Sequence, residues 1–151
     1  MPKPIWSRKR SLKPSHWHER TGRTRVLIED PDLAQGWAAA NILGRAGYDV
    51  LNCPGPEWHI KTTCPLVTEG HCELVDGADI VLCALDLKNA QSNEIFENLR
   101  SNSANKPVVV PVAETPGVDM SGCQVFRRPL TTQRLTAALD EAAAGRESIK
   151  R

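Results

Sequence analysis

Three cysteines and one histidine stand close together in a stretch of the sequence that has no regular pattern. Cys53, Cys64, His71 and Cys72 all lie within residues 53–72, which are rich in proline and glycine. Thiolates and imidazole nitrogens are the usual soft ligands for zinc, iron–sulfur clusters and copper, so these side chains are candidate ligands of a tetrahedral site. Two of the cysteines precede proline, a pattern also seen at some haem- and cluster-binding thiolates.

The same thiols have two other interpretations. Disulfide formation under oxidising conditions would make the loop a redox switch, although a permanent disulfide is not expected in the cytosol. Thiols that only pack are the other alternative, because the spacing C-x10-C-x7-C contains no C-x-x-C pair. Cys83 alternates with apolar neighbours and is expected in the core, and Cys123 is expected to be structural.

Carboxylates follow two short apolar runs. The run RVLIED ends in Glu29 and Asp30, and the run ADIVLCALDL carries Asp86 near its far end. Such runs are typical of strands that are buried on both faces, so the acids stand where strands end. Pro31 follows the first pair and favours a helix start, and acids at a helix start interact well with the helix dipole. Capping is therefore one role for Glu29 and Asp30.

The remaining pattern alternates strands with helices. Strands are predicted at residues 25–30, 48–52, 79–85, 106–112 and 124–127. Helices are predicted at residues 32–45, 91–101 and 132–144, with a short helical turn at 72–76 and loops at 53–71 and 113–122. In the first helix, Leu33, Trp37 and Ala40 repeat with either Asn41 or Gly44 at helical spacing. The other apolar helix positions are Ile95, Phe96, Leu99, Leu135, Leu139 and Ala142.

This order predicts an α/β fold with a doubly wound, mostly parallel, five-stranded sheet of the flavodoxin-like kind. A loop rich in cysteine and proline replaces much of the helix expected after the second strand. In such sheets the functional edge lies at the carboxyl ends of the strands.

With these elements in order, residues 24–144 resemble the receiver domains of two-component response regulators. The segments that carry the resemblance are RVLIEDPD, AGYDV, ADIVLCALDL and RRPLTTQRLTAALDEA. The resemblance implies an acid pair that helps to hold Mg²⁺ and an aspartate at the end of the third strand that accepts a phosphoryl group. It also implies a Ser or Thr and a Lys, after the fourth and fifth strands, that respond to the phosphoryl group. Glu29 and Asp30 match the acid pair.

The remaining positions depart from the family pattern. The acceptor position falls on Ala84, and Asp86 lies two residues further, about 6–7 Å along a strand. In-line transfer tolerates little displacement. The Ser/Thr position falls on Val112, and the Lys position falls on Arg128, which keeps the charge but has a different hydrogen-bond geometry. We therefore expect a pseudo-receiver without phosphotransfer chemistry. Its relic acidic pocket would consist of Glu29, Asp30, Asp86 and Arg128.

Charge is distributed unevenly along the 151 residues. Residues 1–25 carry eight Lys or Arg and one acid, whereas the remaining 126 residues carry 11 basic and 17 acidic side chains. A basic, disordered arm at 1–24, a domain at 25–145 and a tail at 146–151 are predicted. The arm is either a solvated tail or a contact for nucleic acid, an anionic membrane surface or an acidic partner. Its tryptophans would stack on bases, sit at an interface or pin the arm to the domain. The candidate contact residues are Arg8, Lys9, Arg10, Trp6 and Trp17.

Other functional classes lack their motifs. The sequence has no phosphate-binding glycine loop, G-x-S-x-G, H-E-x-x-H or Rossmann fingerprint, so an enzyme is not expected. It has neither a bilayer-length apolar run nor a secretory signal, and the cytoplasm is the expected location. The expected function is a non-catalytic regulatory domain that binds a protein partner and senses metal or redox state through the cysteine loop. The alternatives are a constitutive adaptor, a nucleic-acid-binding regulator, and a phosphoacceptor that uses Asp86 or Asp30 in an unusual geometry. A homodimer is a further expectation.

Overall fold

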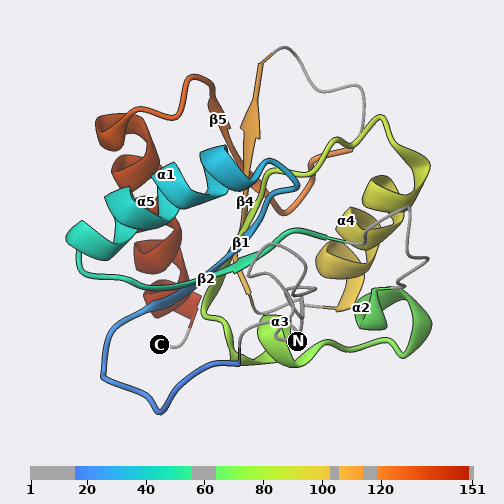
Figure 1. Ribbon diagram of the computed structural model, residues 1–151, viewed down its shortest axis with the longest axis horizontal. Helices are drawn as coiled ribbons and strands as arrows, with labels where there is room; N and C mark the ends of the chain where they lie inside the picture. The colour runs from blue at the N-terminus through green and yellow to red at the C-terminus, as the bar shows by residue number, and fades with distance from the viewer. Residues whose placement is uncertain (1–15, 56–63, 103–105, 114–118, 150–151) are drawn as a thin grey trace, which may run out of the picture.

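A computed structural model of the chain describes residues 16–55, 64–102, 106–113 and 119–149. Five parallel strands form one sheet with the order β2-β1-β3-β4-β5 (Figure 1). The strands are β1 (Arg25–Glu29), β2 (Asp49–Cys53), β3 (Ile80–Cys83), β4 (Val108–Val112) and β5 (Gln124–Arg127). The helices are α1 (Leu33–Arg45), α2 (Pro65–Thr68), α3 (Glu73–Gly77), α4 (Ala90–Asn102) and α5 (Thr132–Ile149).

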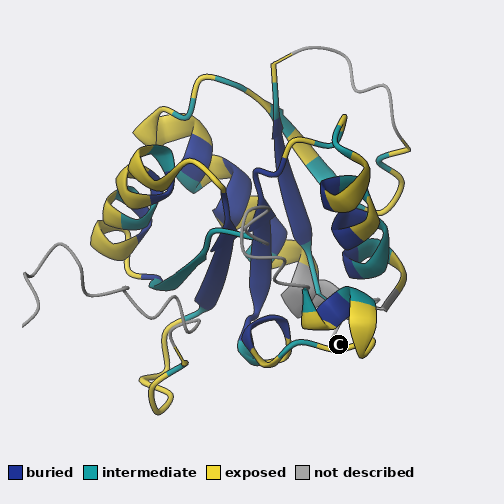
Figure 2. Cartoon of the chain, turned by 45° about the vertical axis from the view of Figure 1, so that its right-hand side comes forward, coloured by how far each residue is buried: buried dark blue, intermediate teal, exposed yellow. Residues whose placement is uncertain are grey.

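The helices cover both faces of the sheet, so the predicted doubly wound fold is confirmed. Helices α1 and α5 lie on one face, and α2, α3 and α4 lie on the other (Figure 1). Alternate residues of β1 and β3 belong to the two resulting cores, which explains why residues 26–28 and 80–83 are all apolar. Both strands are buried along their whole length (Figure 2). The predicted inward positions of the last two long helices are buried: Ile95, Phe96, Leu99, Leu135, Leu139 and Ala142.

Pro111 is compatible with an inner strand because of how the sheet is staggered. The pairing of β3 with β4 covers only Val108 and Val109, whereas β4 pairs with β5 from Val109 to Val112. Pro111 therefore lies beyond the ladder with β3, where its missing N–H breaks no bond to that strand.

Helix α1 has the predicted bounds but turns a different face to the sheet. Its buried residues are Gly36, Ala39 and Leu43. Leu33 and Trp37 point outward instead, with 62% and 71% of their surface exposed. The helix approaches the sheet so closely that a Cβ at position 36 would lie 3.7 Å from both Asn52 Oδ1 and Asp30 Cβ. At position 36 there is room for a small residue but not for a side chain as large as tryptophan.

Three further details differ from the sequence prediction. The stretch at 53–71 contains the short helix α2, whose first residue is proline, a residue that suits this position. Strand β3 is shorter than predicted. Helix α5 continues past Gly145 to Ile149, so the predicted tail at 146–151 is mostly helical. A glycine inside a helix costs about 1 kcal/mol, which does not stop a helix whose other residues favour it.

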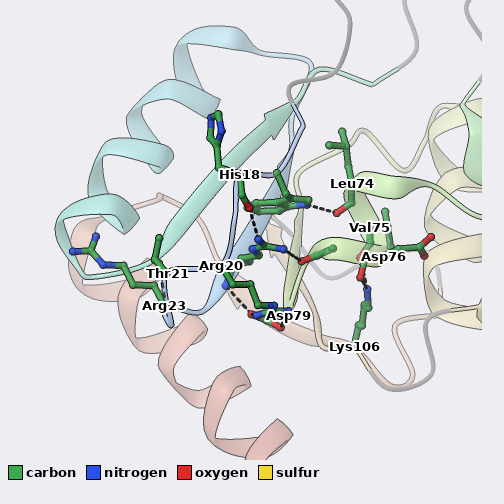
Figure 3. Close-up of polar contacts among 12 residues, drawn as sticks. His18, Arg20, Thr21, Arg23, Leu74, Val75, Asp76, Asp79 and Lys106 are labelled. Atoms are coloured by element: carbon green, nitrogen blue, oxygen red, sulfur yellow. Dashed lines mark hydrogen bonds and ion pairs between the residues drawn. The ribbon is translucent and has the colours of Figure 1, made fainter.

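The segment before β1 is attached to the domain and is not a free arm from residue 16 onward (Figure 3). The Trp17 indole donates to the carbonyl of Leu74 at 2.8 Å, and the guanidinium of Arg25 lies 5.2 Å from the centre of the Trp17 ring. Arg20 donates two hydrogen bonds to Asp79, each 3.2 Å long. The predicted boundary at residue 25 is therefore too late.

The carbonyl groups of α3 receive donors from distant parts of the chain. Trp17 bonds the carbonyl of Leu74, Arg25 bonds that of Gly77, and Lys106 bonds those of Val75 and Asp76 (Figure 3). The carboxyl end of a helix carries partial negative charge, so cationic donors stabilise this short helix. Of the roles considered for Trp17, the structure shows the one in which it attaches the arm to the domain. Because it packs against α3, Trp17 is no longer a candidate contact residue for an external partner.

Candidate functional site

The candidate site lies at the carboxyl edge of the sheet, where β1 and β3 end side by side. Glu29 pairs with Cys83 in the parallel register, and the Ala84 N–H donates to the Glu29 carbonyl at 2.8 Å. Asp30 and Ala84 are the next residues of the two strands. The predicted acceptor position therefore lies beside Asp30 and carries a methyl group.

Asp30 is held in a closed polar network. Its Oδ1 accepts from the Asp32 N–H at 2.9 Å. The Gln35 amide satisfies both of its neighbours when its nitrogen faces Asp30: it then donates to Asp30 Oδ2 at 3.1 Å and accepts from Arg128 Nη1 at 2.7 Å. Burial raises the pKa of Asp30, and the Asp32 N–H and the charge of Arg128 act in the opposite direction. In this orientation Gln35 links Asp30 to Arg128.

Gln35 was missed by sequence reasoning. It lies in the first turn of α1, which the Asp32 side chain caps by accepting from the Gln35 N–H at 3.1 Å. A helix that begins directly after a strand directs the side chains of its first turn back to the edge of the sheet. The position of Gln35 in that first turn could therefore have indicated that it lies at the site.

Glu29 does not join this network. It follows Leu27 by two residues on β1 and therefore points to the opposite face, toward the core that α2, α3 and α4 cover. Only 5% of Glu29 is exposed, and burial raises its pKa from 4.5 to about 7. The prediction that Glu29 and Asp30 share one acidic pocket is wrong, because strand alternation divides them between the two faces.

Asp86 is engaged in a turn of its own. It is exposed in the turn after β3. Its Oδ1 accepts from the Lys88 N–H at 3.1 Å, and its carbonyl accepts from the Asn89 N–H at 3.0 Å. These bonds make Asp86 a turn residue at the entrance to α4.

The side chains at this edge do not form the set of oxygen ligands that would bind Mg²⁺, the metal implied by the resemblance to receiver domains. Both carboxylate oxygens of Asp30 are occupied by N–H donors, the Arg128 guanidinium is close by, and Glu29 faces away. Across the described ranges, no three His, Cys, Asp or Glu side chains come close enough together to hold a metal ion.

All five cysteines lie on the Glu29 side of the sheet. Cys83 is inside that core, and the other four pack against it. Burial raises the pKa of Cys53 to about 12, and the charge of Glu29, its neighbour in the parallel register, adds to the shift. Burial and then Glu29 also raise the pKa of Cys83, so the expected core role of that residue is confirmed. The reactive form of cysteine is the thiolate, so these thiols are poor nucleophiles here.

The predicted ligand set is only partly gathered. Cys64 precedes α2 and Cys72 precedes α3, and both pack against the same core as Cys53. His71 is exposed instead, with its Nδ1 3.7 Å from Asp76 Oδ2. A site made of Cys53, Cys64, Cys72 and His71 would require the histidine to turn inward.

The remaining predicted contact residues lie outside the described residues. They are Trp6, Arg8, Lys9 and Arg10. The role of the basic arm therefore stays a prediction.

Comparison with solved structures agrees with the fold. A response regulator receiver domain protein from Methanospirillum hungatei superposes with a TM-score of 0.64 at 16% identity, covering 83% of this chain and 98% of that one. A putative pilus assembly protein from Burkholderia thailandensis gives 0.62 at 20% identity, covering 80% and 98%. A Thermotoga maritima response regulator in complex with Mg²⁺ and BeF gives 0.58 at 11% identity, covering 79% and 98%.

At these identities the likeness defines the fold, which is that of CheY-like receiver domains. No protein-family model and no curated protein sequence matches the chain. Among the helices that the structure describes, none is both long enough and apolar enough to cross a bilayer.

Proposed function

We propose that this chain is a receiver-like regulatory domain that does not accept a phosphoryl group and that acts by binding a protein partner. The observation that carries the proposal is Ala84, which occupies the strand end beside Asp30 where a receiver places its acceptor. A methyl group cannot form an acyl phosphate.

Asp86 does not replace the missing acceptor. Two residues of extended chain separate it from Ala84, about 6–7 Å. Its carboxylate is already used in the turn that leads to α4. A nucleophile displaced by this distance is not in line with a phosphoryl donor held at Asp30.

The groups that would respond to a phosphoryl group are also changed. Val112 offers no hydroxyl, and its carbonyl accepts from the Arg128 N–H at 2.8 Å. The Arg128 side chain is engaged with Gln35. The Asp30 carboxylate accepts hydrogen bonds from the Asp32 N–H and the Gln35 amide, and Gln35 accepts from Arg128. The negative charge of Asp30 therefore needs no metal ion to neutralise it.

Acetyl phosphate with Mg²⁺ and an intact-mass readout test the proposal. The wild-type chain and the Asp86→Asn variant should gain no phosphoryl mass, while an established receiver domain in the same buffer should gain it. Ala84→Asp alone should also stay unlabelled, because Val112 and Arg128 remain. Labelling of the wild type that Asp86→Asn abolishes would contradict the proposal, and strong labelling of Ala84→Asp would show that the edge is intact.

Metal or redox sensing through the cysteines is a separate prediction. The surroundings of Cys53 and Cys64 favour it less, because burial raises the pKa of both thiols and so disfavours the thiolate form that binds metal or forms a disulfide. Native mass spectrometry of protein purified without oxygen tests it. We expect the mass of the metal-free chain, and no loss of two hydrogens after brief treatment with hydrogen peroxide. A bound metal, cluster or haem that Cys64→Ser removes would establish a ligand site, and a two-hydrogen loss that the same variant prevents would establish a thiol switch.

A further inference from the structure

Helix α1 presents an apolar face to solvent. Leu33 and Trp37 are its large members, and the other exposed positions before Gly44 are Ala34, Ala38 and Asn41. No charged side chain interrupts residues 33–44. A helix of a globular protein normally has a polar outer face, so this face is expected to be covered by another surface.

The size of the side chains changes along this face. The amino-terminal half carries the large Leu33 and Trp37, and the carboxyl-terminal half carries Asn41 and Gly44. Among the residues that the structure describes, no neighbouring side chain or distant backbone lies within 4 Å of a Cβ built at Gly44, so these contacts do not require glycine there. Alanine would favour the helix more than glycine does. A second chain that approaches closely would explain the small residue.

Two copies of α1 packed antiparallel about their midpoints match large residues with small ones. Trp37 of each copy then lies over Asn41 of the other, and Ala34 lies over Gly44. The same arrangement sets the exposed Asp32, just before the helix, near the exposed Arg45 at the end of the second copy's helix. These unlike charges attract, as do antiparallel helix dipoles.

We propose that the exposed face of α1 is a self-association surface, through which two copies of the chain pair about a two-fold axis. A two-fold interface uses the same patch on both copies, and this face is complementary to itself in size and charge. The helix is about 20 Å long, which places the contact at the small end of specific interfaces, so the dimer forms at high protein concentration.

Sedimentation velocity of the full chain, over a concentration series that reaches about 1 mM, tests the surface. The wild type should shift from monomer to dimer. Trp37→Ser should weaken the dimer about tenfold or more, because central aromatic residues dominate interface energies. Val125→Ser is the matched control, because in the described part of the chain Val125 is the one large apolar residue outside α1 that is exposed, at 38%, and it lies on β5. It should leave the dimer unchanged.

The charge pair gives a second set of variants. Arg45→Glu should weaken the dimer, because it places two acids together. Adding Asp32→Asn should restore part of the association, since asparagine removes the repulsion and still caps α1. A wild type that stays monomeric over the whole series would overturn the proposal and leave the face to a different partner. A dimer that Trp37→Ser does not weaken would overturn it as well.

Discussion

Replacing Glu29 with glutamine should stabilise the folded protein at pH 8 by about 3 kcal/mol and have almost no effect at pH 4.5. Burial raises the pKa of Glu29 from 4.5 to about 7, so the folded state holds this proton more tightly than the unfolded state. Between pH 4.5 and about pH 7 the folded state binds more protons than the unfolded state, so the free energy of unfolding falls as the pH rises. Above pH 7 the buried charge is fully present and the loss is complete. Glutamine has the same shape and no charge, which removes this loss.

Urea unfolding at a series of pH values measures the effect as the difference in unfolding free energy between variant and wild type. The difference should grow from pH 4.5 to 7 and stay constant above. Glu94→Gln, at an exposed position of α4, is the control and should show no such growth. A difference that is flat across this range would mean that Glu29 is solvated, and the description of it as a buried carboxyl would be wrong.

Asp79→Ala should destabilise the fold by about 2–4 kcal/mol. Only 3% of Asp79 is exposed, and its Oδ2 accepts from the buried backbone N–H of Arg25 at 2.9 Å. Alanine leaves that N–H without its partner inside the protein. The change also removes the acceptor of Arg20, which attaches the segment from residue 16 to the sheet (Figure 3).

Chemical denaturation at neutral pH measures this loss, and hydrogen exchange locates it. Exchange should accelerate at Trp17 and across α3 in the variant, because the attached segment is released. Asp76→Ala is the matched control, since Asp76 is an exposed acid three residues earlier in the chain. Equal losses of stability in the two variants would show that the buried contact contributes nothing beyond a surface carboxylate.

The order of elements could be predicted because the apolar runs and the helical repeats are long enough to be distinctive. The position of Ala84 followed from counting along one buried strand. The orientation of α1 could not be predicted in the same way, because apolar character alone ranks Trp37 above Gly36 as an inward residue. The orientation is decided by the close approach of Gly36 on α1 to Asn52 on β2. This contact joins two elements, so the helix sequence alone does not reveal it.

The candidate site was predictable only in part. Glu29 and Asp30 are adjacent in the sequence, and their adjacency suggested a common pocket. The strand carries them to opposite faces, where one meets the thiols and the other meets Gln35 and Arg128. Trp17 looked like a free contact residue because the basic charge around it is typical of an arm, and only its partner on α3, 57 residues away in sequence, shows its packing role.

Titration of the ¹⁵N-labelled chain with Mg²⁺ and then beryllofluoride, followed by ¹H–¹⁵N NMR, tests whether this sheet edge binds a phosphoryl group. Beryllofluoride with Mg²⁺ is the pair seen in the Thermotoga maritima response regulator, which serves as the positive control. We predict that the amide signals of Asp30, Ala84 and Arg128 do not move, because the proposed function places Ala84 at the acceptor position and because Asp30 already accepts hydrogen bonds from Asp32 and Gln35. Saturable shifts of these three signals that require both Mg²⁺ and beryllofluoride would show that the edge still binds a phosphoryl group and its metal.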